Sequence, residues 1–208
     1  MVLDRLHEGV SVRAATGDFL RELPSPPSGR LLWAMLGSTF GNLSVSQGRA
    51  LLSRLAERSQ RGDGLLLGVD LAHDRRALVR AYDDEQGVTA AFNLNALTHL
   101  NRVAGADFEV SGFSHVARFD EASSRIEMLL EATRPMRLNV RSIDLSFRLE
   151  RGELLRTEIS EKHTEASLAA RAAGTAWGIG RFVADERRRY ALVLFVRERR
   201  VMSLARRK

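Results

Sequence analysis

The chain has 208 residues, of which 44% are hydrophobic and 28% charged, a composition typical of one substantial core or of a core with an inserted subdomain. It contains no cysteine, which excludes disulfides, thiolate metal sites and cysteine nucleophiles and suits a reducing compartment. It has no run of about eighteen apolar residues and no signal-peptide-like apolar stretch at its start, so we expect a cytoplasmic protein without a membrane segment.

The net charge of +6 is concentrated at the C-terminus. Residues 197–208 carry five Arg and one Lys against one Glu, which leaves the rest of the chain nearly neutral. A basic segment of this kind can contact phosphates. No aromatic residue interleaves with these charges to stack on bases, so a solvated tail over residues 198–208 is favoured over a nucleic-acid interface.

The first part of the chain alternates between strand and helix patterns. The apolar run 30–37 follows a proline-rich segment and ends at a glycine, which predicts a buried, parallel strand. A polar start at Ser44 or Ser46, followed by leucines at helical spacing, predicts a helix. The apolar run 62–71 predicts a second strand. This order indicates an α/β sheet, whose ligands bind beyond the carboxyl ends of the strands.

The pattern changes after residue 72, where two helical segments, 73–84 and 87–105, come first. Three of their residues are expected in the core: Phe92, Leu97 and Leu100. Four runs of strand type follow without an intervening helix: 112–120, 124–133, 136–150 and 153–160. They imply an antiparallel sheet, an α+β element beside the α/β portion. The last part, 164–198, has the pattern of a helix, a strand, a turn and a strand.

A carboxylate and a hydroxyl stand two positions apart in the last of these runs, at Glu158 and Ser160. In a strand, residues two apart point to the same face, so Ile159 between them faces the other way and is expected to turn back into the core. By itself the pair fits the solvated face of an ordinary strand, because single Glu residues are mostly exposed. It also fits one wall of a polar pocket, because a carboxylate and a hydroxyl can satisfy the two unlike nitrogens of an imidazole.

Four motifs stand in order along the chain: GSTFGN at 37–42, RAYDDEQGVTAAFNLN at 80–95, FSHVARFDEASSRIEM at 113–128 and RTEISEKHT at 156–164. Together they resemble the family of S-adenosylmethionine-dependent histidine Nα-methyltransferases, which make trimethylhistidine (histidine betaine) in ergothioneine biosynthesis. The resemblance extends from about Gly17 to about Val196. One departure is Phe40, where an aliphatic residue is usual and where we expect the change to be tolerated beneath the turn.

The resemblance implies an α/β fold: a partial Rossmann-like methyltransferase sheet with an inserted α+β substrate-binding domain. The two pieces of the core would be residues 1–72 and 163–197. The insert would be residues 73–162, and the basic tail residues 198–208. It also implies an enzyme, an S-adenosylmethionine-dependent amino-acid N-methyltransferase, with L-histidine as the small-molecule substrate. No membrane or nucleic-acid partner is implied, and the complete enzyme would be a monomer.

The resemblance also implies roles for five substrate-binding residues. Asn42 and Tyr82 correspond to the side chains that hold the amino-acid end of the substrate, with Tyr82 on its carboxylate. Met128 corresponds to the apolar wall beside the imidazole, although a methionine is most often core filling. Glu158 and Ser160 correspond to the pair that reads the imidazole nitrogens. No residue is assigned as catalytic, and the histidines lack the spacing of a metal site, so no metal is expected.

Three further residues correspond to the family's site for S-adenosylmethionine, the methyl donor. Asp18 and Phe19 match the segment that borders the adenine, where Asp accepts from the exocyclic amine and Phe offers an apolar face. Asp18 could instead be the N-cap of a short helix. Gly37 would lie near the methionine part, where the absence of a Cβ permits close approach.

The family's proteins begin upstream of this sequence, with a first strand, its glycine-rich loop and an acidic residue that holds the ribose. We therefore expect the chain to correspond to the C-terminal portion of such an enzyme, with uncovered sheet surface and with a need for a partner or self-association. The alternatives are a catalytically impaired fragment or partner subunit, and a methyltransferase for another aromatic amino acid. The presence of both Glu158 and Ser160 favours histidine.

Overall fold

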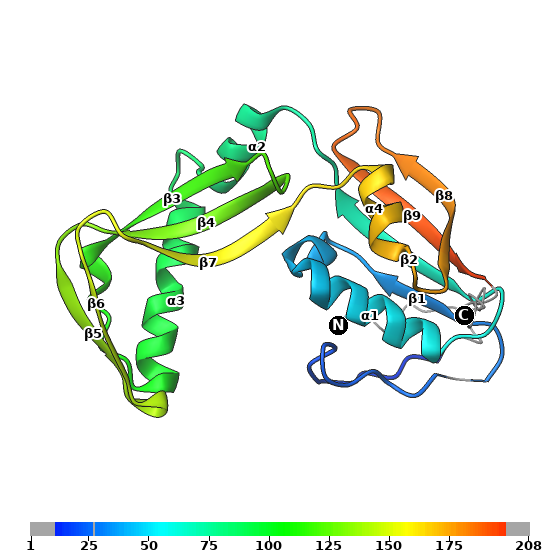
Figure 1. Ribbon diagram of the computed structural model, residues 1–208, viewed down its shortest axis with the longest axis horizontal. Coiled ribbons are helices and arrows are strands. Elements are labelled where there is room, and N and C mark those ends of the chain that lie inside the picture. The colour runs from blue at the N-terminus through cyan, green and yellow to red at the C-terminus, as the bar shows by residue number, and fades with distance from the viewer. Residues whose placement is uncertain (1–10, 27, 199–208) are drawn as a thin grey trace, which may run out of the picture.

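A four-stranded sheet, a three-stranded sheet and a two-stranded hairpin make up the β structure of the described residues, and helices pack on the two larger sheets (Figure 1). The structure is a computed structural model that describes residues 11–26 and 28–198. The basic tail predicted at 198–208 therefore lies outside the described residues except for Glu198, as do residues 1–10 of the predicted core. None of the described helices is long and apolar enough to cross a membrane.

The first sheet has the strand order β1-β2-β9-β8, with β1 parallel to β2 and the other neighbours antiparallel. Its strands are β1 (Leu32–Met35), β2 (Gly64–Asp70), β8 (Trp177–Ala184) and β9 (Tyr190–Arg197). Helix α1 (Val45–Glu57) connects β1 to β2, as predicted, and Ser44 is its N-cap in a capping box with Gln47. These elements form part of a Rossmann-like sheet, and the α/β prediction is confirmed.

Only one face of this sheet is covered by helices in the described part of the chain. Helices α1 and α4 (Glu165–Ala172) lie side by side on that face, and their leucines pack on alternate residues of β2 and β9 (Figure 1). On the opposite face, Leu32 is 57% and Leu192 42% exposed. The prediction that the run 30–37 is buried was therefore wrong for one face, because no described helix covers it.

The second sheet is antiparallel, with the order β3-β4-β7. It is built from β3 (Phe113–Asp120), β4 (Arg125–Ala132) and β7 (Leu154–Glu161), and helices α2 (Arg75–Tyr82) and α3 (Val88–Ala104) contact it. Leu97 of α3 is buried as predicted. Phe92 and Leu100 are 67% and 40% exposed, so their predicted burial was wrong. Phe92 points away from the side of α3 that carries the buried Asn93 and Leu97.

The run 136–150 does not form one strand of this sheet, contrary to the prediction. It folds back on itself as a separate hairpin of β5 (Met136–Val140) and β6 (Leu145–Leu149). A short 3-10 turn, η4 (Arg141–Ile143), and Asp144 with a φ of 47° reverse the chain between them. Aspartate tolerates this left-handed backbone better than most residues, which is why the reversal occurs here.

Candidate functional site

The predicted substrate residues lie where the two sheets meet. The turn η2 (Thr39–Asn42) follows β1 at the carboxyl end of the parallel strands, and β7 runs past it from the second sheet. Tyr82 is the last residue of α2, which packs on β3 and β4. Five predicted residues from four elements thus gather at the edge where ligands of α/β sheets bind.

One face of β7 carries the polar wall. Glu158 pairs with Met128 of β4, and Ser160 pairs with Ile126, so all four side chains share one side of the sheet. Met128 and Ser160 are 3% and 2% exposed. Ile159 pairs with Glu127 on the opposite side and is only half-buried, so the expectation that it turns into the core was wrong.

A β-bulge in β7 makes this wall possible. The register shifts between Met128 and Leu129, and Thr157 is the extra residue on β7. As a result Leu155, which packs with the core beneath α3, and Glu158 lie on the same face although they are three residues apart. Thr157 is held by its hydroxyl, 2.6 Å from Asn93 Oδ1 and 3.0 Å from the Met128 carbonyl oxygen.

Asn42 and Glu158 contact each other directly. The Asn42 amide nitrogen Nδ2 donates to Glu158 Oε1 at 3.1 Å, which joins the turn after β1 to the polar wall. The other oxygen of the Glu158 carboxylate has no hydrogen-bond partner among the described residues, so it can accept one from a ligand.

Tyr82 and Ser160 form a second contact. The Tyr82 hydroxyl donates to Ser160 Oγ at 2.9 Å. The position of Tyr82 is fixed through its backbone, because His115 Nε2 lies 2.8 Å from the Tyr82 carbonyl oxygen and His115 Nδ1 lies 2.9 Å from the Asn93 amide. This assigns the proton of His115 to Nε2, which donates to the carbonyl, while Nδ1 accepts from Asn93.

Two residues that the sequence interpretation missed complete the group: Lys162 and Asp70. The Lys162 side chain is fully buried, and its Nζ lies 2.7 Å from Asp70 Oδ2. The same ammonium contacts the Tyr82 and Ser160 hydroxyls, at 2.9 Å and 2.8 Å. A signal for Lys162 was present in the sequence, because it continues the alternation that puts Glu158 and Ser160 on one face.

The turn GSTFGN is shaped by close packing. A Cβ on Gly41 would lie 2.7 Å from the carbonyl oxygen of Glu161, so only glycine allows η2 to approach β7 this closely. Phe40 is 1% exposed and packs in the first core, as expected for the residue beneath the turn. The packing places Asn42 within reach of Glu158.

The residues predicted to bind the methyl donor are not joined to this group by hydrogen bonds. Gly37 follows β1 with a φ of +77° and open space where a Cβ would stand, and its amide donates to the Tyr190 hydroxyl at 3.2 Å. Asp18 does not cap a helix, because its side chain accepts from the Leu20 amide in a turn and pairs with Arg21. Both carboxylate oxygens are thus engaged within the turn.

Phe19 borders an apolar cavity of about 190 Å³ beside β1. The cavity is also lined by residues of β1, α1 and the N-terminal segment: Leu23, Pro24, Trp33, Met35 and Leu51. The apolar surface fits a flat aromatic ring. Phe19 and Gly37 therefore suit the predicted donor, whereas Asp18 would have to exchange a local partner.

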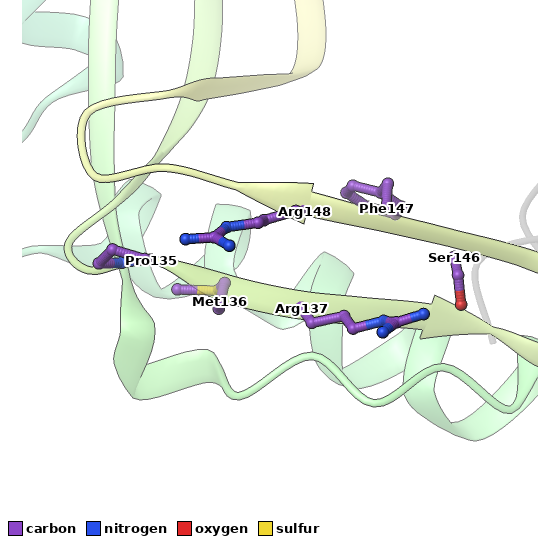
Figure 2. A pocket seen from close by; sticks show the side chains of 6 residues that line it. All are labelled: Pro135, Met136, Arg137, Ser146, Phe147 and Arg148. Atoms are coloured by element: carbon purple, nitrogen blue, oxygen red, sulfur yellow. The ribbon is translucent and has the colours of Figure 1, made fainter.

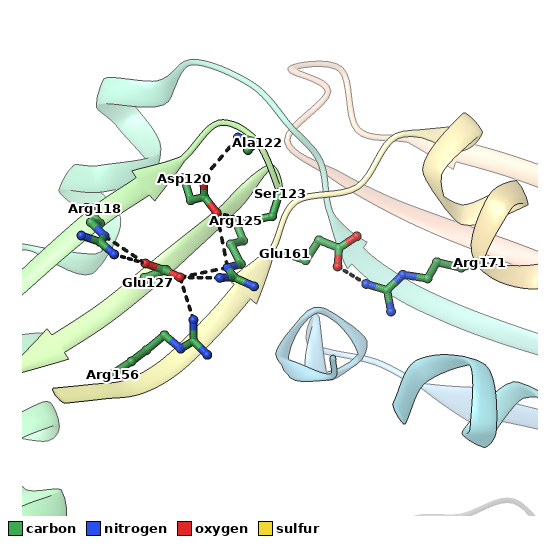
Figure 3. Close-up of polar contacts among 9 residues, drawn as sticks. All are labelled: Arg118, Asp120, Ala122, Ser123, Arg125, Glu127, Arg156, Glu161 and Arg171. Carbon is green, nitrogen blue, oxygen red and sulfur yellow. Dashed lines mark hydrogen bonds and ion pairs between the residues drawn. The ribbon is translucent and has the colours of Figure 1, made fainter. Parts of the chain in front are cut away.

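Ionic contacts lie on the other face of the second sheet and between β7 and α4 (Figure 3). The buried Glu127 carboxylate accepts from Arg118, Arg125 and Arg156. Burial alone would raise the pKa of Glu127, but the three arginines outweigh it and lower the pKa to about 2. Glu161 pairs with Arg171 of α4, and burial raises the pKa of Glu161 against this pairing.

A larger hollow lies elsewhere on the described surface. It has a volume of about 500 Å³ and is lined by Pro135, Met136, Arg137, Ser146, Phe147 and Arg148 on the β5 and β6 hairpin (Figure 2). It contains no carboxylate or buried polar network of the kind found between β7 and η2. Its size alone gives no reason to place the chemistry there.

The partial Rossmann-like sheet, the antiparallel sheet between its strands β2 and β8, and the polar wall near the carboxyl ends of β1 and β2 define an α/β protein. The sequence model of the family described as histidine-specific methyltransferase, SAM-dependent, matches residues 2–197. The chain belongs to this family.

Individual relatives of the chain are also named as methyltransferases. The chain is 42% identical to the histidine N-alpha-methyltransferase of Mycobacterium tuberculosis (strain CDC 1551 / Oshkosh) over 92% of its own length and 60% of the relative's. It is 44% identical to the enzyme of that name from Mycolicibacterium smegmatis, over 79% and 51% of the two chains. An L-tryptophan methyltransferase of Psilocybe serbica is 30% identical over 64% and 37%. The chain therefore spans about half to three fifths of the length of the two histidine methyltransferases.

Proposed function

We propose that this chain supplies the substrate-binding part of an S-adenosylmethionine-dependent enzyme that methylates the α-amine of L-histidine to the trimethyl betaine. The observation that carries the proposal is the polar wall of β7, where the half-buried Glu158 offers a carboxylate and the buried Ser160 a hydroxyl on one face. These groups match the two unlike nitrogens of an imidazole. The name of the family supports the same substrate.

The proposal gives each of the five side chains a role. Glu158 and Ser160 take the imidazole, and Met128 supports it with its apolar side chain from the neighbouring strand. Asn42 and Tyr82 hold the amino-acid end. Asn42 Nδ2 has a second N–H to donate to the carboxylate, and the Tyr82 oxygen, whose proton goes to Ser160, has a lone pair left to accept from the α-amine. Binding the imidazole at one end of the substrate orients the reacting nitrogen at the other end. Binding energy from the ring thereby contributes to alignment of the reacting atoms.

S-adenosylmethionine would supply an electrophilic methyl group on its sulfonium sulfur. Phe19 is suited to the adenine and Gly37 to the methionine part, with Asp18 contributing once it releases the Leu20 amide. In each of three transfers the lone pair of the neutral amine would form the new N–C bond as the C–S bond breaks with its electron pair on sulfur. The nitrogen would lose a proton after the first and second transfers, and the third would leave it quaternary. The chain's own residues contribute by binding and orientation.

Within this proposal, residues 73–162 are the substrate-binding insert, and 1–72 and 163–197 are the two pieces of the core. The insert would place α2 and β7 over the turn η2. A cytoplasmic location and the absence of a nucleic-acid partner stay predictions, and the lack of cysteine suits the first of them.

The test is calorimetric titration of the chain with L-histidine, L-tryptophan and L-tyrosine, with and without S-adenosylmethionine, followed by mass spectrometry of methylated product. Binding of histidine at least about tenfold tighter than of the other two is expected, because their rings leave Glu158 or Ser160 unpaired. Equal affinities, or a preference for tryptophan, would overturn the proposal.

A second candidate is a subunit that works only when another polypeptide covers it. The uncovered face of the first sheet supports this candidate, since Leu32, Val183 and Leu192 are each more than two fifths exposed there. The outer edge of β1 is also unpaired among the described strands. Light scattering after size exclusion, repeated with Leu192→Lys, distinguishes the candidates: association that the variant abolishes favours the second, and a monomer that binds histidine excludes it.

A further inference from the structure

Lys162 brings a positive charge into the interior at the end of the polar wall. Its side chain has no solvent exposure, and burial of an ammonium is costly unless every N–H has a partner. All three are used, on Asp70 Oδ2, Tyr82 Oη and Ser160 Oγ. If Lys162 served stability alone, an apolar side chain could take its place at a lower desolvation cost. Its contacts with two hydroxyls that are proposed to bind the ligand suggest instead that the ammonium acts on those hydroxyls.

The hydrogen bonds among Lys162, Tyr82 and Ser160 run in one direction. An ammonium can only donate, so the Tyr82 and Ser160 oxygens both accept from Lys162. The Tyr82 hydroxyl, which has one proton, donates it to Ser160 Oγ. The Ser160 oxygen then has both lone pairs occupied, one by Lys162 and one by Tyr82. Its own proton is left to point at whatever lies against the wall.

We propose that Lys162 is a positioning residue that fixes Ser160 as a hydrogen-bond donor, so that the site takes a neutral imidazole presenting a lone pair to Ser160 and an N–H to Glu158. The inference rests on the proposed function and adds the protonation state and tautomer of the bound ring. An imidazolium has N–H groups on both nitrogens and would meet the Ser160 proton with another proton.

The neighbouring groups hold Lys162 in this role. Its backbone amide donates to the Ser124 carbonyl at 2.7 Å, and its carbonyl accepts from the Ser124 hydroxyl, which ties it to the turn between β3 and β4. Asp70, at the end of β2, balances its charge at 2.7 Å. The next carboxylate along the strand, Glu161, faces the other side and pairs with Arg171. The Lys162 ammonium is therefore held against the Tyr82 and Ser160 hydroxyls.

The experiment is nitrogen NMR of ring-labelled L-histidine bound to the full chain at about pH 6, where the free ring is mostly protonated. The wild type is expected to give one protonated and one unprotonated ring nitrogen in a single tautomer. Lys162→Met frees a lone pair on Ser160, so its hydroxyl can also accept. Bound histidine should then appear as imidazolium or as a tautomer mixture, with affinity lowered about tenfold or more.

Two controls separate this role from general damage. The double variant Asp70→Asn with Lys162→Met removes both charges, leaves no ion unpaired, and is expected to show the same spectral change. Arg171→Met removes a cation from the same junction without touching either hydroxyl, and it is expected to keep the wild-type spectrum.

The outcomes are distinct. An unchanged single neutral tautomer in the two Lys162 variants would overturn the inference and leave the proposed function standing. A wild-type spectrum of bound imidazolium would overturn it as well. A wild-type chain that binds no histidine would overturn the proposed function and this inference with it.

Discussion

Asn42 and Glu158 are separated by 116 positions in the sequence, yet the Asn42 amide donates to the Glu158 carboxylate at 3.1 Å. The contact joins the end of the first parallel strand to the wall of the second sheet. It leaves one carboxylate oxygen free of partners among the described residues. The two sheets are therefore linked by groups that are themselves proposed to bind the substrate.

Glu158→Gln is expected to weaken histidine binding by about tenfold to a hundredfold, since a hydrogen bond to a charged acceptor is worth roughly 1.5–3 kcal/mol. Affinity for S-adenosylmethionine should change by less than about threefold, because Glu158 lies on β7 and the proposed donor residues lie before and after β1. Calorimetric titration with each ligand measures both. Glu131→Gln, on the opposite face of β4, is the matched control, and an equal loss in that variant would contradict the role of Glu158.

Much of the fold was predictable because it depends on local patterns. The strand, helix and strand at the start, the capped start of α1 at Ser44 and the closing pair β8 and β9 all have local apolar periodicity and turn signals. The hairpin of β5 and β6 was missed because its reversal depends on Asp144 in a left-handed conformation, which composition does not reveal. Burial of Phe92 was misjudged because helical periodicity does not say which face meets the sheet.

The individual residues of the candidate site could be predicted only from the four sequence motifs that resemble the family. Asn42, Tyr82, Met128, Glu158 and Ser160 lie together, but their roles stay predictions. Lys162 and Asp70 were missed because a lysine on a strand face is normally solvated, and its burial depends on the approach of β2 and α2. Tertiary packing, which the sequence does not display, brings these elements together.

Gly41→Ala is expected to destabilise the protein by about 1–3 kcal/mol, because overpacking against backbone cannot be relieved by a rotamer change. The added Cβ would meet the Glu161 carbonyl oxygen at 2.7 Å. Since the turn must retreat from β7, Asn42 should also lose contact with Glu158, and histidine binding should weaken. Urea unfolding measures the first effect. Gly17→Ala, where nothing lies within 4 Å of the added atom, is the control and should be close to neutral.

Glu127→Gln is expected to lower the free energy of unfolding at pH 7 by about 1–3 kcal/mol, because three charge-assisted hydrogen bonds are weakened. The folded pKa of Glu127, about 2, is below its ordinary value of 4.5. Its stabilisation is thus present above pH 4.5 and is lost as pH falls toward 2. Unfolding curves across this window should be flatter in the variant than in the wild type. Parallel curves would show that Glu127 does not titrate with folding.

His163→Leu tests a buried imidazole whose two nitrogens have no hydrogen-bond partner among the described residues. Burial, reinforced by the Arg171 and Lys162 cations, lowers the pKa of His163 from 6.5 to about 4. The neutral ring is therefore favoured in the folded state, and its stability contribution is lost as pH falls from 6.5 toward 4. Leucine has a similar volume and no unpaired polar atoms, so stability at pH 7 should be unchanged or higher by about 1 kcal/mol.

The measurement for this variant is thermal unfolding between pH 7 and 4. The wild type should lose stability through the lower part of that range more steeply than His163→Leu, because only the wild type must take up a proton on this ring when it unfolds. His99→Leu, on the exposed surface of α3, controls for removal of a histidine without burial. A steeper loss in the His163 variant than in the wild type would mean that the ring is charged in the folded protein.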